Sequence, residues 1–299
     1  MTTTQLTTNV HDTALIFEGG GMRGAYTAPV VSTLLEAGIH VEWFAGISAG
    51  STHVCNYASR DAARARRSFV DIVSDPEFGG MRSFLRGDGY FNAAHIYEHT
   101  SLPDEWLPFD WATYRDNPVQ PRVGAFNATR GQEVWFTKED MSTLVDLTVR
   151  VRASSTLPVL MPPVTIDGEV FVDGALGPDG GIALDAAESE GYEKFFVVLT
   201  RSRTYVKGPQ RFPSAAWLRR RYRDLPSVAE GILARPDRYN ETRRRVFELE
   251  QQGRALVFAP EDLHITNTEK RLSRLERTWE AGLAQARREL PRWQEFLGV

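Results

Sequence analysis

The feature that most constrains the fold of this 299-residue chain is a repeated pattern near its N-terminus. Twice, a short apolar run ends in glycine and is followed by a helical pattern. The runs are residues 13–17 (TALIF), which lead into a triple glycine, and residues 41–45 (VEWFA), which stop at Gly46. An order of strand, helix, strand and helix implies parallel strands joined by right-handed crossovers. We therefore expect a three-layer α/β/α fold, with a mostly parallel central sheet and helices on both faces.

The rest of the chain supplies further strands and helices for this fold. A hairpin that turns on Asp167-Gly168 is expected over residues 164–172, and residues 74–120 are dense in Gly, Pro, Asp and aromatic residues, which is typical of a surface cap of loops and short helices. The other predicted strands are 121–126, 133–136, 195–199 and 255–259, and the predicted helices are 25–35, 49–67 and 140–153.

The domain organisation follows from the last of these strands. We expect residues 1–12 to form a loose N-terminal segment and residues 13–299 a single domain, because the strand at 255–259 should rejoin the sheet. Residues 205–252 are then an arginine-rich helical insertion near the C-terminus. Residues 201–254 hold fourteen Lys and Arg against six Asp and Glu, although the whole chain has a net charge of −4. This excess fits either a surface for anionic partners or a solvated helical face with locally paired arginines.

Composition excludes several other classes of protein. A hydrophobic content of 42% and a charged content of 25% are ordinary for a globular protein. The single cysteine, Cys55, excludes an internal disulfide framework and a multi-cysteine metal site. Met1 to Asp12 lack the pattern of a secretory signal, and no apolar run approaches the length of a membrane-spanning helix. A cytoplasmic location is the default expectation.

A candidate nucleophile lies where the second predicted strand meets the next helix. Residues 46–50 read Gly-Ile-Ser-Ala-Gly, a G-x-S-x-G pattern in the strand–turn–helix setting of a nucleophile elbow. A serine at so tight a turn has strained backbone angles, and its neighbours must be glycine to avoid clashes. The following helix directs its first N–H groups at negative charge formed there. Ser48 is therefore a candidate nucleophile, and its alternative role is that of a helix cap.

The glycine run at residues 19–24 (GGGMRG) directly follows the first predicted strand. Its uncovered N–H groups can converge on an oxyanion. The run also matches the dinucleotide fingerprint G-x-G-x-x-G, but that interpretation requires an acid at the end of the second strand, where this chain has Phe44-Ala45-Gly46. Arg23 could bind a headgroup phosphate or hold the glycine loop through an acid such as Glu18, and we favour the structural role.

A serine nucleophile usually takes a histidine as its base. His53 lies one helical turn beyond Ser48 and points along the helix, while His264 follows the last strand and is the plausible late triad histidine. His95 and His99 have the i, i+4 spacing of a metal pair, but no third ligand is evident. The sequence contains six histidines, each with a surface or core role as the simpler interpretation: His11, His40, His53, His95, His99 and His264.

Four motifs together are similar to those of the patatin-like phospholipase family. They are GGGMRG (19–24), GISAG (46–50), ASSTLPVLMPPV (153–164) and VDGA (172–175). The resemblance covers residues 13 to 200, and the end of the chain resembles the bacterial branch of the family, which has a C-terminal helical region. It implies a patatin-like catalytic domain that works with a Ser–Asp dyad and requires neither a metal nor an organic cofactor.

Carried over to this sequence, the resemblance makes Ser48 the nucleophile and Asp173 its base. Ala175 stands where many members have glycine, and both residues occur in the family. The resemblance also implies an oxyanion-hole loop of Gly19, Gly20, Gly21, Met22, Arg23 and Gly24, an elbow formed by Gly46, Ile47, Ala49 and Gly50, and a DGA motif completed by Gly174 and Ala175.

The predicted function is that of a serine acyl hydrolase, which cleaves lipid acyl esters through an acyl-serine intermediate. An ordinary carboxylate is a weak base, so burial must raise the pKa of Asp173. Asp179 is the competing candidate for the base. The expected partners are a lipid or acyl-ester substrate and, as a peripheral contact, anionic membranes, but not nucleic acid. The alternative is a non-catalytic lipid- or dinucleotide-binding protein that uses the glycine-rich loop.

Overall fold

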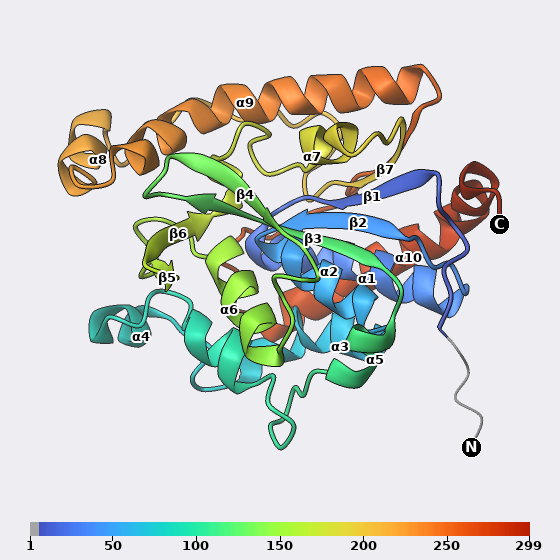
Figure 1. Ribbon diagram of the computed structural model, residues 1–299, viewed down its shortest axis with the longest axis horizontal. Coiled ribbons are helices and arrows are strands. Elements are labelled where there is room, and N and C mark those ends of the chain that lie inside the picture. Colours follow the sequence, from blue (N-terminus) through green and yellow to red (C-terminus); the bar gives the residue numbers. More distant parts are fainter. Residues whose placement is uncertain (1–5) are drawn as a thin grey trace.

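A computed structural model describes residues 6–299 and contains an eight-stranded sheet with helices on both faces (Figure 1). Along the sheet the strand order is β5-β6-β3-β2-β1-β7-β8, and β4 pairs with β3 outside this path. The strands are β1 (Thr13–Phe17), β2 (Trp43–Ile47), β3 (Gln120–Asn127), β4 (Gln132–Phe136), β5 (Val164–Ile166), β6 (Glu169–Asp173), β7 (Lys194–Val198) and β8 (Ala255–Phe258).

The helices complete the predicted three-layer α/β/α architecture. In Figure 1, α7 (Leu184–Ser189) and α9 (Pro226–Gln251) lie above the sheet, and α8 (Ala215–Arg221) extends to the left of α9. The helices drawn below the sheet are α1 (Gly24–Glu36), α2 (Ala49–Ala58), α3 (Ala62–Arg67), α5 (Trp111–Asp116), α6 (Leu144–Ser154) and α10 (Leu272–Leu297), with α4 (Met81–Arg86) at the lower left.

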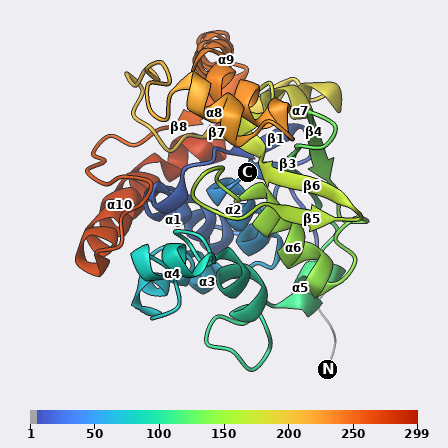
Figure 2. The same ribbon diagram turned by 90° about the vertical axis from the view of Figure 1, so that its left-hand side faces the viewer.

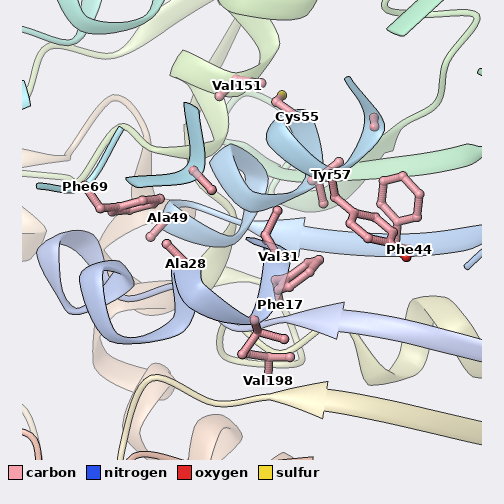
Figure 3. Packing of buried hydrophobic residues seen from close by; sticks show 14 of the residues in the cluster. Phe17, Ala28, Val31, Phe44, Ala49, Cys55, Tyr57, Phe69, Val151 and Val198 are labelled. Atoms are coloured by element: carbon pink, nitrogen blue, oxygen red, sulfur yellow. The ribbon is translucent and has the colours of Figure 1, made fainter. Parts of the chain in front are cut away.

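Alternation along the central strands divides the core between the two faces of the sheet. In β1, Leu15 and Phe17 belong to the cluster that includes residues of α1, α2 and α10, whereas Ala14 and Ile16 belong to the cluster that includes residues of α7 and α9. Such two-sided burial is expected of a strand covered by helices on both faces. On the first face, the Phe44 ring of β2 packs edge-on against Tyr57 of α2, with 5.0 Å between ring centroids (Figure 3).

The pairing of the strands agrees with the predicted, mostly parallel sheet. β1 pairs in parallel with β2 and β7, β2 with β3, and β7 with β8. The antiparallel pairs lie at one end of the sheet, where β3 pairs with β4 and β6, and β5 pairs with β6. The β5–β6 hairpin turns at Asp167 and Gly168 with φ values of 51° and 81°, as their sequence predicts.

Strand β3 brings the ends of two other strands together. β4 pairs along one edge of β3, so β2 and β6 must share the other edge. On that edge Gly124 pairs with Ile47, the last residue of β2, and the next residue, Ala125, pairs with Asp173, the last residue of β6. The residue that follows β2 and the residue that ends β6 therefore meet beside the same point of β3.

One predicted helix is divided in the structure. The predicted helix over 49–67 is two helices, α2 and α3, because Arg60 has a φ of 52° and the Asp61 side chain caps the next helix by accepting a hydrogen bond from the Arg64 N–H. The segment 74–120 consists of loops and short helices, as predicted, with α4, α5 and a π-helical turn, η3 (Ala94–His99).

Part of the N-terminal segment expected to be loose is held against the domain. Residues 1–5 lie outside the described residues. Val10 pairs in parallel with Val41, and the Asn9 side chain donates to the Gly38 carbonyl at 2.9 Å. Among residues 6–299, none of the helices combines the length and apolar character required to cross a bilayer.

The arginine-rich segment forms α8 and α9, after which β8 returns to pair with β7. Several of its arginines are in ion pairs. Arg219 pairs with Glu230, Arg244 with Glu241 and Glu248, and Arg245 with Asp185 and Glu188. Arg220 and Arg221 are exposed and form no ion pair with another residue in the described part of the chain. Of these acidic partners only Asp185 and Glu188 lie outside residues 201–254, so most of the excess positive charge remains. Arg220 and Arg221 present two of these charges on α8.

Candidate active site

Ser48 occupies a strained turn between β2 and α2. Its backbone angles are φ 57° and ψ −123°, a conformation that residues with a side chain rarely adopt. A Cβ on Gly46 would lie 2.2 Å from the Gly50 carbonyl oxygen, and a Cβ on Gly50 would lie 2.2 Å from the carbonyl oxygen of Phe17. The turn therefore needs glycine at both positions, as the sequence predicts. Ser48 itself is 6% exposed.

A second serine, from α6, supports this turn. The Ser48 main-chain N–H donates to Ser154 Oγ at 2.9 Å, and the Ser154 hydroxyl in turn donates to the Gly124 carbonyl at 2.6 Å. The Ser51 hydroxyl donates to the Ser48 carbonyl at 2.6 Å. Sequence reasoning assigned no role to Ser154. Its position in the 153–164 motif was the signal that could have indicated one.

Asp173 ends β6 and is 2% exposed. Its Oδ1 accepts a hydrogen bond from the Ala175 N–H at 2.9 Å. Burial raises the pKa of the Asp173 carboxyl, while the charge of Arg235, the Ala175 N–H, the Ser48 side chain and Lys207 act to lower that pKa. Ser48 is thus near enough to influence the carboxyl as a hydrogen-bond donor. Asp173 Oδ2 nevertheless has no hydrogen-bond partner of usual geometry among residues 6–299, so the contact with Ser48 is looser than a hydrogen bond.

The glycine-rich loop adjoins Ser48, and a Cβ on Gly19 would lie 3.2 Å from the Ser48 Cβ. Four of its six N–H groups already donate to backbone carbonyls: Gly19 to Gly181, Met22 to Asn267, Arg23 to Gly20 and Gly24 to Gly21. The N–H groups of Gly20 and Gly21 have no acceptor within residues 6–299. Gly21 also lines the same pocket as Ser48. The structure therefore leaves these two N–H groups available to an oxyanion.

Arg23 is 8% exposed and holds this loop to the segment that follows β7. Its Nε donates to the Thr200 carbonyl at 3.2 Å, while Glu18 accepts from the Thr200 N–H at 2.6 Å and from the Tyr239 hydroxyl at 2.7 Å. Burial lowers the pKa of Arg23 to about 10, so the guanidinium stays charged near neutral pH. Arg23 and Glu18 both act on Thr200, which favours the structural role expected for Arg23.

The histidines lie apart from Ser48. His53 is fully buried between the rings of Phe17 and Phe69, contacts Thr27 Oγ1 at 2.8 Å, and has its pKa lowered to about 3 by burial. His264 is exposed and pairs with Asp262. His11, His95 and His99 contact Glu42, Asp75 and Glu105, respectively. Among residues 6–299 no histidine lines the pocket at Ser48, and no group of three or more His, Cys, Asp or Glu is arranged to hold a metal ion.

Asp179 lies in a different environment from that of Asp173. It is fully buried, and its Oδ2 accepts a hydrogen bond from the Asp185 N–H at 3.0 Å. Burial raises the pKa of Asp179 to about 9, with further increases from Asp185 and Glu133. Within the described residues no hydrogen bond joins it to Ser48. A carboxyl that is protonated at neutral pH is poorly suited to deprotonate a serine, so Asp173 is the better candidate for the base.

An apolar pocket extends from Ser48 between α2, α6 and the segment 68–109. Figure 3 shows four of its lining residues, which come from three parts of the chain: Ala49 and Cys55 of α2, Val151 of α6, and Phe69. Residues 74–109 contribute mostly apolar side chains to this pocket: Phe78, Phe91, Ile96, Tyr97, Leu107 and Phe109. The segment expected to be a surface cap thus forms one wall of a pocket that could hold a long apolar group.

Comparison with protein families gives two matches. The family described as patatin-like phospholipase matches residues 15–182, which include Ser48 and Asp173. A second family, described as a domain of unknown function (DUF6363), matches residues 225–298, which cover α9, β8 and α10.

Among known proteins, the chain is 28% identical over 192 residues to patatin-like phospholipase domain-containing protein 6 of Mus musculus and of Homo sapiens, covering 60% of this chain. The match covers only 13% and 12% of those proteins, so the chain spans about an eighth of their length. The uncharacterized protein YjjU of Escherichia coli is 23% identical over 286 residues, covering 90% of this chain and 74% of that protein. The crystal structure of VipD from Legionella pneumophila has a similar fold, with a TM-score of 0.50 at 13% identity, over 96% of this chain and 67% of that chain.

Proposed function

Because the chain belongs to the patatin-like phospholipase family, we propose that it hydrolyses acyl esters of lipids with Ser48 as nucleophile and Asp173 as base. One observation carries this proposal. Gly124 and Ala125 of β3 pair with Ile47 and Asp173, and this brings the buried carboxylate close to the strained serine, which lines an apolar pocket. An ester whose acyl chain lies in the pocket would have its carbonyl carbon next to Ser48.

In the acylation step, Asp173 Oδ2 accepts the proton of the Ser48 hydroxyl while Oγ attacks the ester carbonyl carbon. The raised pKa of the buried carboxyl makes Asp173 a stronger base than an exposed aspartate. The N–H groups of Gly20 and Gly21 stabilise the oxyanion, a contribution of about 10²–10³ in rate per donor. The tetrahedral intermediate collapses, the ester bond breaks, and the leaving alcohol takes the proton from Asp173.

Deacylation reverses these roles with water in place of the alcohol. Asp173 removes a proton from a water molecule that attacks the acyl-Ser48 carbonyl. The second oxyanion collapses, Ser48 Oγ leaves with the proton held by Asp173, and the carboxylic acid is released. The dyad returns to its starting state, and the sum of the two steps is the hydrolysis of one ester bond.

Access to lipid would come from a membrane-facing surface beside the Ser48 pocket. A second pocket adjoins the Ser48 pocket through Met161, which lines both, and Phe84 of α4 and Arg221 of α8 also line it. Large apolar side chains are exposed here on α4: Met81 at 65%, Phe84 at 41% and Leu85 at 79%. α8 adds exposed Trp217 beside Arg220 and Arg221. Figures 1 and 2 show α4 and α8 on the same side of the molecule, on either side of the β5–β6 hairpin.

Apolar side chains interspersed with unpaired arginines suit a bilayer surface that carries anionic headgroups. We therefore include peripheral contact of this face with anionic membranes in the proposed function. The contact would bring the Ser48 pocket close to its lipid substrate.

A fluorophosphonate probe and a p-nitrophenyl acyl ester together test the proposed chemistry. Labelling and hydrolysis by the unaltered protein should both disappear in Ser48→Ala, because the probe needs the nucleophile. Asp173→Asn should also lower hydrolysis to near background, because the two residues act as a unit. His264→Ala is the control, since this exposed histidine lies outside the pocket and its removal should leave hydrolysis unchanged.

The competing functions predict different results. A lipid- or dinucleotide-binding protein would show neither labelling nor hydrolysis. A Ser–His mechanism would be indicated if His264→Ala lost several hundredfold in activity. Asp179 would replace Asp173 as the base if Asp173→Asn retained activity and Asp179→Asn did not.

A further inference from the structure

A single positive charge is buried in the wall of the otherwise mainly apolar Ser48 pocket. Arg64 of α3 lines the pocket and is 6% exposed. Its guanidinium lies over the ring of Phe109, with 5.2 Å from Cζ to the ring centroid. A buried charge is costly unless it is paired, so its partners indicate what it does.

Arg64 has no ionic partner within residues 6–299. Nη1 donates to Asn56 Oδ1 at 2.7 Å and Nη2 donates to Ser101 Oγ at 3.1 Å, both uncharged acceptors. Its Nε has no hydrogen-bond partner in the same residues. The nearby carboxylate of Asp61 accepts from the Arg64 main-chain N–H as a helix cap and does not form an ion pair with the guanidinium.

These contacts orient the side chain but do not neutralise it. A guanidinium has five N–H donors, and the two hydrogen bonds to Asn56 and Ser101 leave one N–H on each terminal nitrogen for another acceptor, while the buried Nε has none. Burial lowers the pKa of Arg64 to about 10, so it is still charged near neutral pH. An arginine that only filled space in the core would be expected to have a carboxylate beside it.

The distance between Ser48 and the Arg64 guanidinium can be estimated along α2. Ser48 and Cys55 both line the pocket, and they are separated by about two turns of α2, or about 10 Å along the helix axis. Asn56, which follows Cys55, is the residue that holds the Arg64 guanidinium. The distance between the nucleophile and the positive charge is therefore comparable to the length of a medium-length acyl chain.

We propose that the Ser48 pocket selects medium-length acyl chains that end in a carboxylate, and that Arg64 is the residue that recognises this terminal group. The inference rests on the proposed function and specifies its substrate class as monoesters of dicarboxylic acids. The chain lies along the apolar wall, and its far carboxylate pairs with the Arg64 guanidinium in a charge-assisted hydrogen bond. A free dicarboxylic acid offers the same chemistry, and the experiment separates the two sources.

Two chromogenic esters of equal chain length test the specificity: mono-p-nitrophenyl azelate, which has a terminal carboxylate, and p-nitrophenyl nonanoate, which does not. We expect kcat/KM for the azelate ester to exceed that for the nonanoate ester by about tenfold or more, the effect of one hydrogen bond to a charged group. Arg64→Met should abolish or reverse this ratio. Arg67→Met, the same substitution on the same helix at a residue that does not line the pocket, should keep it.

Binding measurements separate this inference from the proposed function. In Ser48→Ala, calorimetry should show that free azelate binds more tightly than nonanoate and that adding Arg64→Met removes the difference. Hydrolysis of neither ester by the unaltered protein would reject the proposed function, while tighter binding of azelate would still support the role of Arg64. Equal kcat/KM values for the two esters in the unaltered protein would overturn the inference, whether or not the Arg64 variant folds. Equal binding of the two free acids would overturn it as well.

Discussion

The Ser154 hydroxyl of α6 accepts a hydrogen bond from the main-chain N–H of Ser48, with 2.9 Å between Ser48 N and Ser154 Oγ. It also donates to the Gly124 carbonyl, so one side chain links the elbow to the strand that aligns both halves of the proposed dyad. A positive φ at Ser48 stores strain, which the surrounding structure has to maintain. The hydrogen bond from the Ser48 N–H to Ser154 helps to hold the backbone in this conformation.

Ser154→Ala should therefore reduce activity and stability together. The substitution leaves the buried Ser48 N–H and Gly124 carbonyl without their partner, which should lower the free energy of unfolding by about 1–3 kcal/mol. A displaced nucleophile should reduce kcat by about tenfold to a hundredfold. Urea unfolding and ester hydrolysis measure the two effects, with Ser189→Ala on the surface of α7 as the control. A stability loss without a change in kcat would restrict Ser154 to a role in folding.

Asp179 should make stability depend on pH. Its folded-state pKa of about 9 lies above the value near 4 of an unfolded chain, so the native state binds the proton more tightly. The resulting stabilisation is complete below pH 4 and is lost as the pH rises towards 9. Asp179→Asn mimics the protonated carboxyl, and its free energy of unfolding should therefore fall less over this range.

Urea unfolding at intervals between pH 4 and pH 9 checks this prediction. Some pH dependence should persist in Asp179→Asn, because burial also raises the pKa of Glu133, to about 7. Identical pH profiles for the unaltered protein and the variant would show that Asp179 is ionised in the native state.

Membrane contact should depend on the two unpaired arginines of α8. Replacing Arg220 and Arg221 with Gln removes two exposed charges and should weaken binding to anionic vesicles by about tenfold. Replacing Arg244 and Arg245 with Gln changes the net charge equally, but these residues are in ion pairs on α9 and their loss should matter less. Sedimentation with vesicles of increasing anionic content, at low and high salt, compares the variants.

If the two double variants sediment alike, net charge rather than the α8 surface determines binding. If neither the unaltered protein nor the variants bind vesicles, the apolar side chains of α4 have another role.

The layers of the fold and the mostly parallel pairing of its strands could be predicted from sequence because they follow from local patterns. The glycine turns ended two strands, and β-branched and aromatic runs marked the others. The break between α2 and α3 could not be predicted from the run of Ala and Arg around it, since these residues favour helix throughout. It depends on the cap that Asp61 provides and on the left-handed backbone of Arg60.

The candidate site divides in the same way. Ser48 and Asp173 belong to motifs that can be read locally, but Ser154 and Arg64 have roles that exist only where segments distant in sequence meet. Six N–H groups of the glycine loop were equivalent candidates for the oxyanion hole in the sequence. Only the folded chain distinguishes the N–H groups of Gly20 and Gly21. Those of Gly19 and Met22 already donate hydrogen bonds to carbonyls from distant parts of the chain.

The short ladder between β3 and β6 has a consequence for thermal inactivation. Only three residue pairs join these strands: Ala125–Asp173, Phe126–Val172 and Asn127–Phe171. β1, by contrast, is paired along its length with β7 inside the sheet. Segments with few pairings open at lower free energy than the sheet they border. On heating, the carboxylate should therefore leave the serine while the central strands are still intact, and the protein would lose activity before it unfolds.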